Sequence, residues 1–150
     1  MSVLYGNNLG YDAPDNVFDI ASTLLQFEQK FLSWERSLPA TLSILDPASI
    51  LSGTDNRETL RFRFILTMRF LNLRILTHRP ILCKHLDLLG NPNSDSEQLN
   101  MLRQVSANSL RVCGQSALEL VKIIRSVVNP PNPPRYLLGA WWFALYYSKF

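Results

Sequence analysis

The chain has 150 residues, of which 47% are hydrophobic and 18% are charged, and its net charge is +3. This length suits one domain, and the composition is that of a folded globular protein, which excludes a largely disordered chain. A charge of +3 does not by itself indicate a nucleic-acid-binding protein. No apolar run reaches the roughly 18 residues that a membrane helix requires, so no membrane contact is predicted.

The first helix is predicted between a polar N-terminal region and a proline. Residues 1–14 are expected to form an irregular lead-in, because they are rich in Gly and Asn. Asp15 or Asn16 can cap a helix that runs to about Ser37, with apolar residues at helical spacing on one face. Trp34 near its end is predicted to anchor the packing.

Residues 39–57 are predicted to form a loop with a short turn at 48–51, because prolines and a glycine interrupt every helical pattern there. Thr54 or Asp55 is the expected cap of the following helix.

The next predicted helix, residues 57–77, has apolar residues on two sides. One seam consists of Leu60, Phe64, Met68, Leu71 and Ile75, and the other of Phe62, Leu66, Phe70 and Leu73. A helix that is apolar on two sides is buried between other helices, so residues 57–77 are predicted to be the central helix.

A helix boundary is predicted just before Pro80, because proline is favourable at a first helical position. A short helix would run from there to about Leu89, followed by a loop at 90–95. At this corner, His78 and Arg79 are expected to hydrogen-bond the last carbonyls of the preceding helix.

A long amphipathic helix is predicted from Ser96 to about Val128, where consecutive prolines stop it. Its apolar face is expected to contain Leu99, Leu102, Leu110, Cys113, Ala117, Leu120, Val121, Ile124 and Val128. Cys113 is interpreted as a small buried thiol.

The last segment, residues 136–150, is apolar nearly all round. A domain rarely ends inside a buried helix, so the sequence predicts an incomplete domain. The expected fold is all-α, with about five helices in orthogonal or bundle-like packing around the central helix 57–77. Trp141, Trp142 and Tyr146, together with His78 and Arg79, are the candidates for contacts to a ligand or between helices.

The sequence predicts neither a metal site nor a catalytic site. The candidate metal ligands are His78, Cys83 and His85, which is fewer than the four that a structural zinc site uses. No nucleophile motif and no phosphate-binding glycine loop is present, so the chain is not predicted to be an enzyme.

Three stretches of the chain match one known pattern in order and spacing. They are Trp34–Leu42 (WERSLPATL), Leu71–Leu82 (LNLRILTHRPIL), and the helix from Cys113 to Ala117 that leads through a proline loop to Ala140–Tyr147 (AWWFALYY). The set resembles the regulatory "middle homology" domain of fungal zinc-cluster transcription factors. In that family W-x-x-x-L-P is followed by L-x-H-R-P-x-L and then by an aromatic W-W helix.

The resemblance implies that residues 15–150 are part of an all-α regulatory domain that controls transcription in the nucleus. Zinc is expected only in an upstream cluster that this chain lacks, so no direct DNA contact is expected. The implied partners are proteins of the transcription machinery or the rest of the same factor, and a small-molecule effector and self-association are further candidates. The alternative is a free-standing helical module that senses a metabolite through its aromatic residues and the His78–Arg79 corner.

Overall fold

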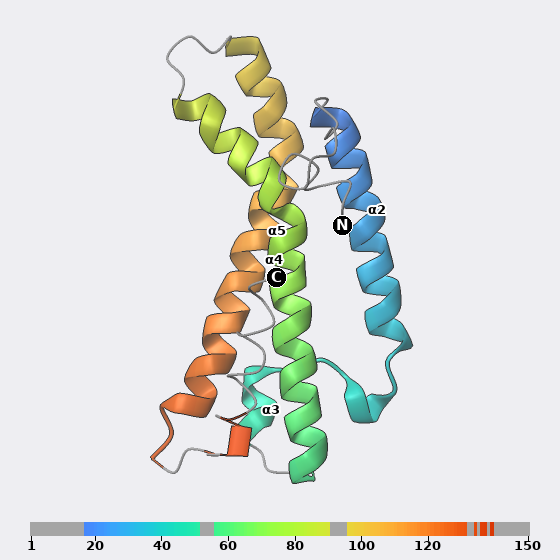
Figure 1. Cartoon of the computed structure of the whole chain (residues 1–150), viewed down its shortest axis with the longest axis vertical. Helices are drawn as coiled ribbons and strands as arrows, with labels where there is room; N and C mark the ends of the chain where they lie inside the picture. Colours follow the sequence, from blue (N-terminus) through green and yellow to red (C-terminus); the bar gives the residue numbers. More distant parts are fainter. Residues whose placement is uncertain are drawn as a thin grey trace. The chain divides into compact units, whose positions relative to one another are not determined.

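A computed structural model describes residues 17–51, 56–90, 96–131, 134, 136, 137 and 139. Over these ranges the chain is helical and contains no β-strand, which confirms the all-α class (Figure 1). The described residues within 17–31 and 74–114 form one compact unit (unit 1), and those within 32–73 and 115–150 form another (unit 2). The expected lead-in at 1–14 lies outside the described residues.

The described chain contains three long helices and two short elements, which can be followed in Figure 1. They are α2 (Val17–Ser37), the 3-10 helix η1 (Ala40–Leu42), α3 (Pro47–Leu51), α4 (Arg57–Gly90) and α5 (Ser96–Val128). The predicted end of α2 and both predicted ends of α5 are confirmed. Within the described ranges, no helix has the length and apolarity that crossing a bilayer requires.

The helix boundary predicted before Pro80 is wrong, because α4 continues through this proline to Gly90. The predicted helix 57–77 and the predicted short helix are therefore one element, and the count of about five helices is not confirmed. A proline inside a helix costs about 3 kcal/mol. Side chains on both sides of Pro80 offset this cost, since His78 and Ile81 are almost completely buried.

The start of α4 is capped by a residue other than the predicted ones. The backbone N–H of Glu58 donates to Oδ1 of Asn56 at 3.2 Å. Asn56 is among the preferred capping residues, because its side-chain oxygen satisfies an amide that the helix leaves unpaired. The caps expected at Thr54 and Asp55 lie outside the described residues.

Unit 1 has an apolar core to which all three long helices contribute. Ile20 and Leu24 of α2 pack with Ile81 of α4 and Leu102 of α5. The spacing of Ile20 and Leu24 places both on one face of α2.

In unit 2, the loop after α2 is fastened to α4. The backbone N–H of Leu45 donates to Oγ1 of Thr67 at 2.9 Å, and the Arg63 guanidinium donates to the carbonyl oxygen of Ser43 at 2.9 Å. Trp34 packs on Phe70 with ring centroids 5.4 Å apart, as its predicted role requires, although it stays 38% exposed.

Only one of the two predicted apolar seams of α4 has no exposed residue. Leu60, Phe64, Met68 and Leu71 are buried and Ile75 is half-buried, which confirms the first seam. The second seam is wrong at two positions, because Phe62 is 63% exposed and Leu73 is 36% exposed. Phe70 of this seam is buried beneath Trp34.

The predicted apolar face of α5 is confirmed at half of its described positions. Leu102 and Cys113 are buried and Leu120 and Ile124 are half-buried, whereas Leu110, Ala117, Val121 and Val128 are exposed. One seam of buried or half-buried positions recurs every three or four residues, and it shares Leu102, Cys113 and Leu120 with the predicted face: Leu102, Ser106, Ser109, Cys113, Ser116, Leu120, Ile123 and Val127. This spacing is that of a helix-packing seam, and three of its positions are serines, whose small side chains let a neighbouring helix approach closely.

The different burial of Phe64 and Phe62 gives a direct test of the α4 seam. Phe64→Ala should lower the free energy of unfolding by about 3–5 kcal/mol, because it leaves a cavity in the core. Phe62→Ala, two residues away on the same helix, should cost less than about 1 kcal/mol. Urea denaturation of both variants measures the difference, and equal losses would contradict the packing described here.

Candidate functional site

The histidine of the H-R-P sequence lies at the centre of a buried polar cluster in unit 1. His78 is 1% exposed. Its Nε2 lies 3.0 Å from Oε1 of Glu28 in α2, and its Nδ1 lies 2.9 Å from Oγ of Ser109 in α5. One imidazole therefore connects three helices.

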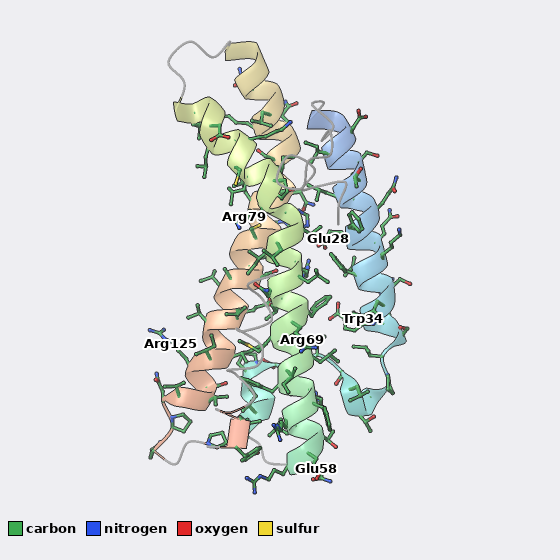
Figure 2. All side chains as sticks on the ribbon, viewed as in Figure 1. Glu28, Trp34, Glu58, Arg69, Arg79 and Arg125 are labelled. Atoms are coloured by element: carbon green, nitrogen blue, oxygen red, sulfur yellow. The ribbon has the colours of Figure 1, made fainter. Side chains whose placement is uncertain are left out.

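Glu28 also forms an ion pair with Arg74 of α4. The Arg74 Nη2 donates to Oε2 of Glu28 at 2.8 Å, and Nε donates to Oε1 at 3.2 Å. This fork-to-fork geometry is the strong form of an arginine–carboxylate contact. Glu28 follows Leu24 by four residues and Ile20 by eight, so its carboxylate lies on the buried face of α2. Figure 2 shows Glu28 on the side of α2 toward α4.

The environment of Glu28 keeps its carboxyl group ionised. Burial alone raises the pKa of Glu28, but hydrogen bonds from His78 and Arg74 and the charges of both residues lower it from 4.5 to about 2. An ionised carboxylate only accepts hydrogen bonds, so Nε2 of His78 donates to Glu28.

Two further contacts extend the cluster along α4 and α5. Oγ of Ser106 lies 3.1 Å from Nδ1 of His85, and the Cys113 thiol donates to the carbonyl oxygen of Ile75 at 3.6 Å. As the α5 residue number rises from 106 through 109 to 113, the α4 partner falls from 85 through 78 to 75. The two helices are therefore antiparallel in unit 1, and small α5 side chains set their register (Figure 1).

Cys113 is the buried thiol that the sequence predicted. Burial raises the pKa of Cys113, and the negative charge of Glu28 raises it further. A thiol with a raised pKa is a poor nucleophile at neutral pH. Cys113 is therefore a packing residue of this cluster.

The three candidate metal ligands, His78, Cys83 and His85, all lie on α4. Both ring nitrogens of His78 have hydrogen-bond partners, and Cys83 is exposed. Among the residues that the structure describes, no three His, Cys, Asp or Glu side chains gather as metal ligands. The candidate ligands His78, Cys83 and His85 are thus not brought together.

Arg79 is the one further predicted site residue that the structure describes. Arg79 is exposed and lies on a different side of α4 from Glu28 (Figure 2). The capping role predicted for His78 and Arg79 is wrong, because α4 does not end between them. The predicted contacts of Trp141, Trp142 and Tyr146 lie outside the described residues.

Sequence reasoning missed Glu28, Arg74 and the serines of α5. A signal was available for Glu28, because it stands in register with Ile20 and Leu24. A signal was also available for Ser106 and Ser109. The positions Leu102, Ser106, Ser109 and Cys113 follow one another at intervals of four, three and four residues, which is the spacing of one helix face. Counting apolar residues alone hides both patterns, since polar side chains occupy buried positions.

The fold and the cluster together define a helical module held together by a buried ionic and hydrogen-bonded core. Comparisons with known proteins place it in a biological context. Nearly the whole chain matches "Transcription factor FBD3" of Gibberella moniliformis, at 30% identity over 148 residues that cover 97% of this chain and 19% of that protein. It also matches "Transcription factor FBD3" of Fusarium pseudograminearum, at 32% identity over 149 residues that cover 95% of this chain and 19% of that protein.

A third relative is "Sorbicillinoid biosynthetic cluster transcription factor 2" of Penicillium rubens, at 28% identity over 125 residues that cover 82% of this chain and 17% of that protein. The homologues of this chain are therefore fungal transcription factors, which confirms the resemblance in the sequence. The chain spans about a fifth of the length of these relatives. No family model matches the chain, and no solved structure matches it.

The lowered pKa of Glu28 predicts a pH dependence of stability. The carboxylate stabilises the fold fully above pH 4.5, and this contribution is lost as the pH falls toward the folded-state pKa of about 2. Between pH 5 and pH 2 the free energy of unfolding should fall by up to about 3 kcal/mol from this group. Urea denaturation at successive pH values measures the slope.

Glu28→Gln removes the titrating group while keeping its shape. The free energy of unfolding of this variant should therefore fall less steeply between pH 5 and pH 2 than that of the wild type. Glu58→Gln is the matched control, because Glu58 is exposed and its variant should keep the wild-type slope. Identical slopes for Glu28→Gln and wild type would contradict the role assigned to this carboxylate.

Proposed function

We propose that this chain is a regulatory segment of a fungal-type transcription factor, acting in the nucleus through contacts with other proteins or with the rest of the same factor. The observation that carries the proposal is the match of nearly the whole chain to fungal transcription factors. A free-standing metabolite-binding module is not favoured, because the three relatives described above are named as transcription factors.

The described side chains support a protein-contact role over a DNA-contact role. Two of the arginines of α4 are used internally, since Arg63 bonds to Ser43 and Arg74 to Glu28. DNA binding requires basic residues that are free to contact phosphates on one face. In this proposal a zinc cluster outside these residues recognises DNA.

The proposal predicts that the isolated chain binds DNA weakly and without sequence preference. Titration with a labelled duplex should give binding that disappears between 50 and 200 mM salt, as expected for purely electrostatic contacts. A tight complex with one duplex sequence that resists salt would contradict the proposal.

Regulation itself is tested by inserting the chain between a heterologous DNA-binding domain and an activation domain. The insert should change reporter output at least about twofold relative to a flexible spacer of equal length, a modest effect that corresponds to about 0.4 kcal/mol. Glu28→Ala, which leaves His78 and Arg74 without their carboxylate, should abolish the change.

Gln29→Ala is the matched control, because Gln29 is the next residue of α2 and is exposed. It should retain the effect of the wild-type insert. Reporter output equal to that of the spacer, with the inserted chain present at the same protein level, would count against a regulatory role.

A further inference from the structure

Unit 2 contains a pocket that no part of the proposed function uses. Its volume is about 560 Å³. Four parts of unit 2 surround it: the end of α2, the segment that leads into α3, the helix α4 and the helix α5. Leu45, Leu71 and Ile123 line it and are all buried, so its base is apolar. Volumes of about 300–1,000 Å³ are typical of small-molecule sites.

The charged residues around this pocket are mostly acidic. The pocket is lined by three carboxylates and one ammonium group, which belong to Glu35, Asp46, Glu119 and Lys122. The lining therefore has an excess of two negative charges. Asp46 accepts a hydrogen bond from the backbone N–H of Ala48 at 3.3 Å. Glu35 and Glu119 form no ion pair with any residue of the described ranges. Two carboxylates on two different helices are therefore available to a ligand.

The wall formed by residues 44–48 is held in place by hydrogen bonds of Leu45 and of the adjacent Ser43. Leu45 bonds to Thr67 at 2.9 Å, and the Arg63 guanidinium bonds to both the carbonyl oxygen and the hydroxyl of Ser43, each at 2.9 Å. Both contacts tie the segment to α4. A pocket with a fixed wall binds a ligand without the entropic cost of ordering that wall.

We propose that this pocket binds a small organic cation, an amine attached to an apolar body. The apolar body would lie on Leu45, Leu71 and Ile123, and the ammonium group would lie between the carboxylates of Glu35 and Glu119. The acidic rim is opposite in sign to the net charge of +3 of the chain, so general charge attraction to the protein does not explain such binding. This inference is independent of the proposed function, since it concerns binding by the chain alone.

Three probes of equal shape separate the roles of charge and apolar contact. Cyclohexylmethylamine, cyclohexylmethanol and cyclohexanecarboxylate are titrated into the ¹⁵N-labelled chain, and amide chemical shifts report binding. The amine should bind at least about tenfold more tightly than the alcohol and the carboxylate. Its shifts should centre on Leu45, Thr67 and Ile123. Equal affinity for amine and alcohol, or no binding by a folded chain, would overturn the proposal.

Single substitutions then test the rim. Glu119→Gln should weaken amine binding by about tenfold, and Lys122→Met should strengthen it by about threefold, because the two residues contribute opposite charges. Both side chains are exposed, so both variants should fold. Glu58→Gln, which removes an exposed carboxylate outside the pocket, should leave affinity unchanged.

Two results would replace the proposal. An equal loss of amine affinity in Glu58→Gln would show that the attraction is not specific to the pocket. Binding of a lysine-containing peptide at these residues, without binding of the amine, would identify a surface that docks a protein.

Discussion

The ion pair and hydrogen bonds of Glu28 are the interactions on which the structure of unit 1 depends. The carboxylate contacts Arg74 and His78, and His78 contacts Ser109, so a single buried charge connects α2, α4 and α5. Burying a charge is costly unless partners satisfy it. Because these partners come from residues far apart in the chain, the cluster favours one arrangement of three helices and opposes any shift in register.

The H-R-P sequence has different roles at its three positions. His78 is a buried connector, Arg79 is exposed, and Pro80 lies inside α4 without ending it. A proline in mid-helix is tolerated where tertiary contacts hold both sides, and His78, Ile81 and His85 supply such contacts. This explains why a motif that reads as a helix boundary in the sequence lies within one helix in the structure.

Sequence patterns predicted the positions of the helices better than the faces that they bury. The ends of α5 and the first seam of α4 follow from proline positions and apolar spacing, which are local properties. The buried face of α5 depends on serines that pack against histidines of α4, and no local pattern of apolar residues reports that pairing. The register of Glu28 with Ile20 and Leu24 indicates a buried position, but its ion pair with Arg74 becomes visible only when both partners are placed in space.

Two features of the molecule bear on the proposed regulatory role. Unit 1 has a buried polar cluster beside its apolar core, which suits a framework, while unit 2 has a pocket that is lined by three carboxylates and one lysine. The relatives of this chain are transcription factors about five times its length, so such a framework would work within a larger assembly.

A double-mutant cycle between Glu28 and His78 tests the central claim most directly. Glu28→Ala, His78→Ala and the double variant are compared with wild type by urea denaturation at neutral pH. A direct buried contact predicts a coupling energy of at least about 1 kcal/mol, with the double variant less destabilised than the sum of the single ones. Losses that add within about 0.5 kcal/mol would show that these two side chains do not interact, and would contradict the account.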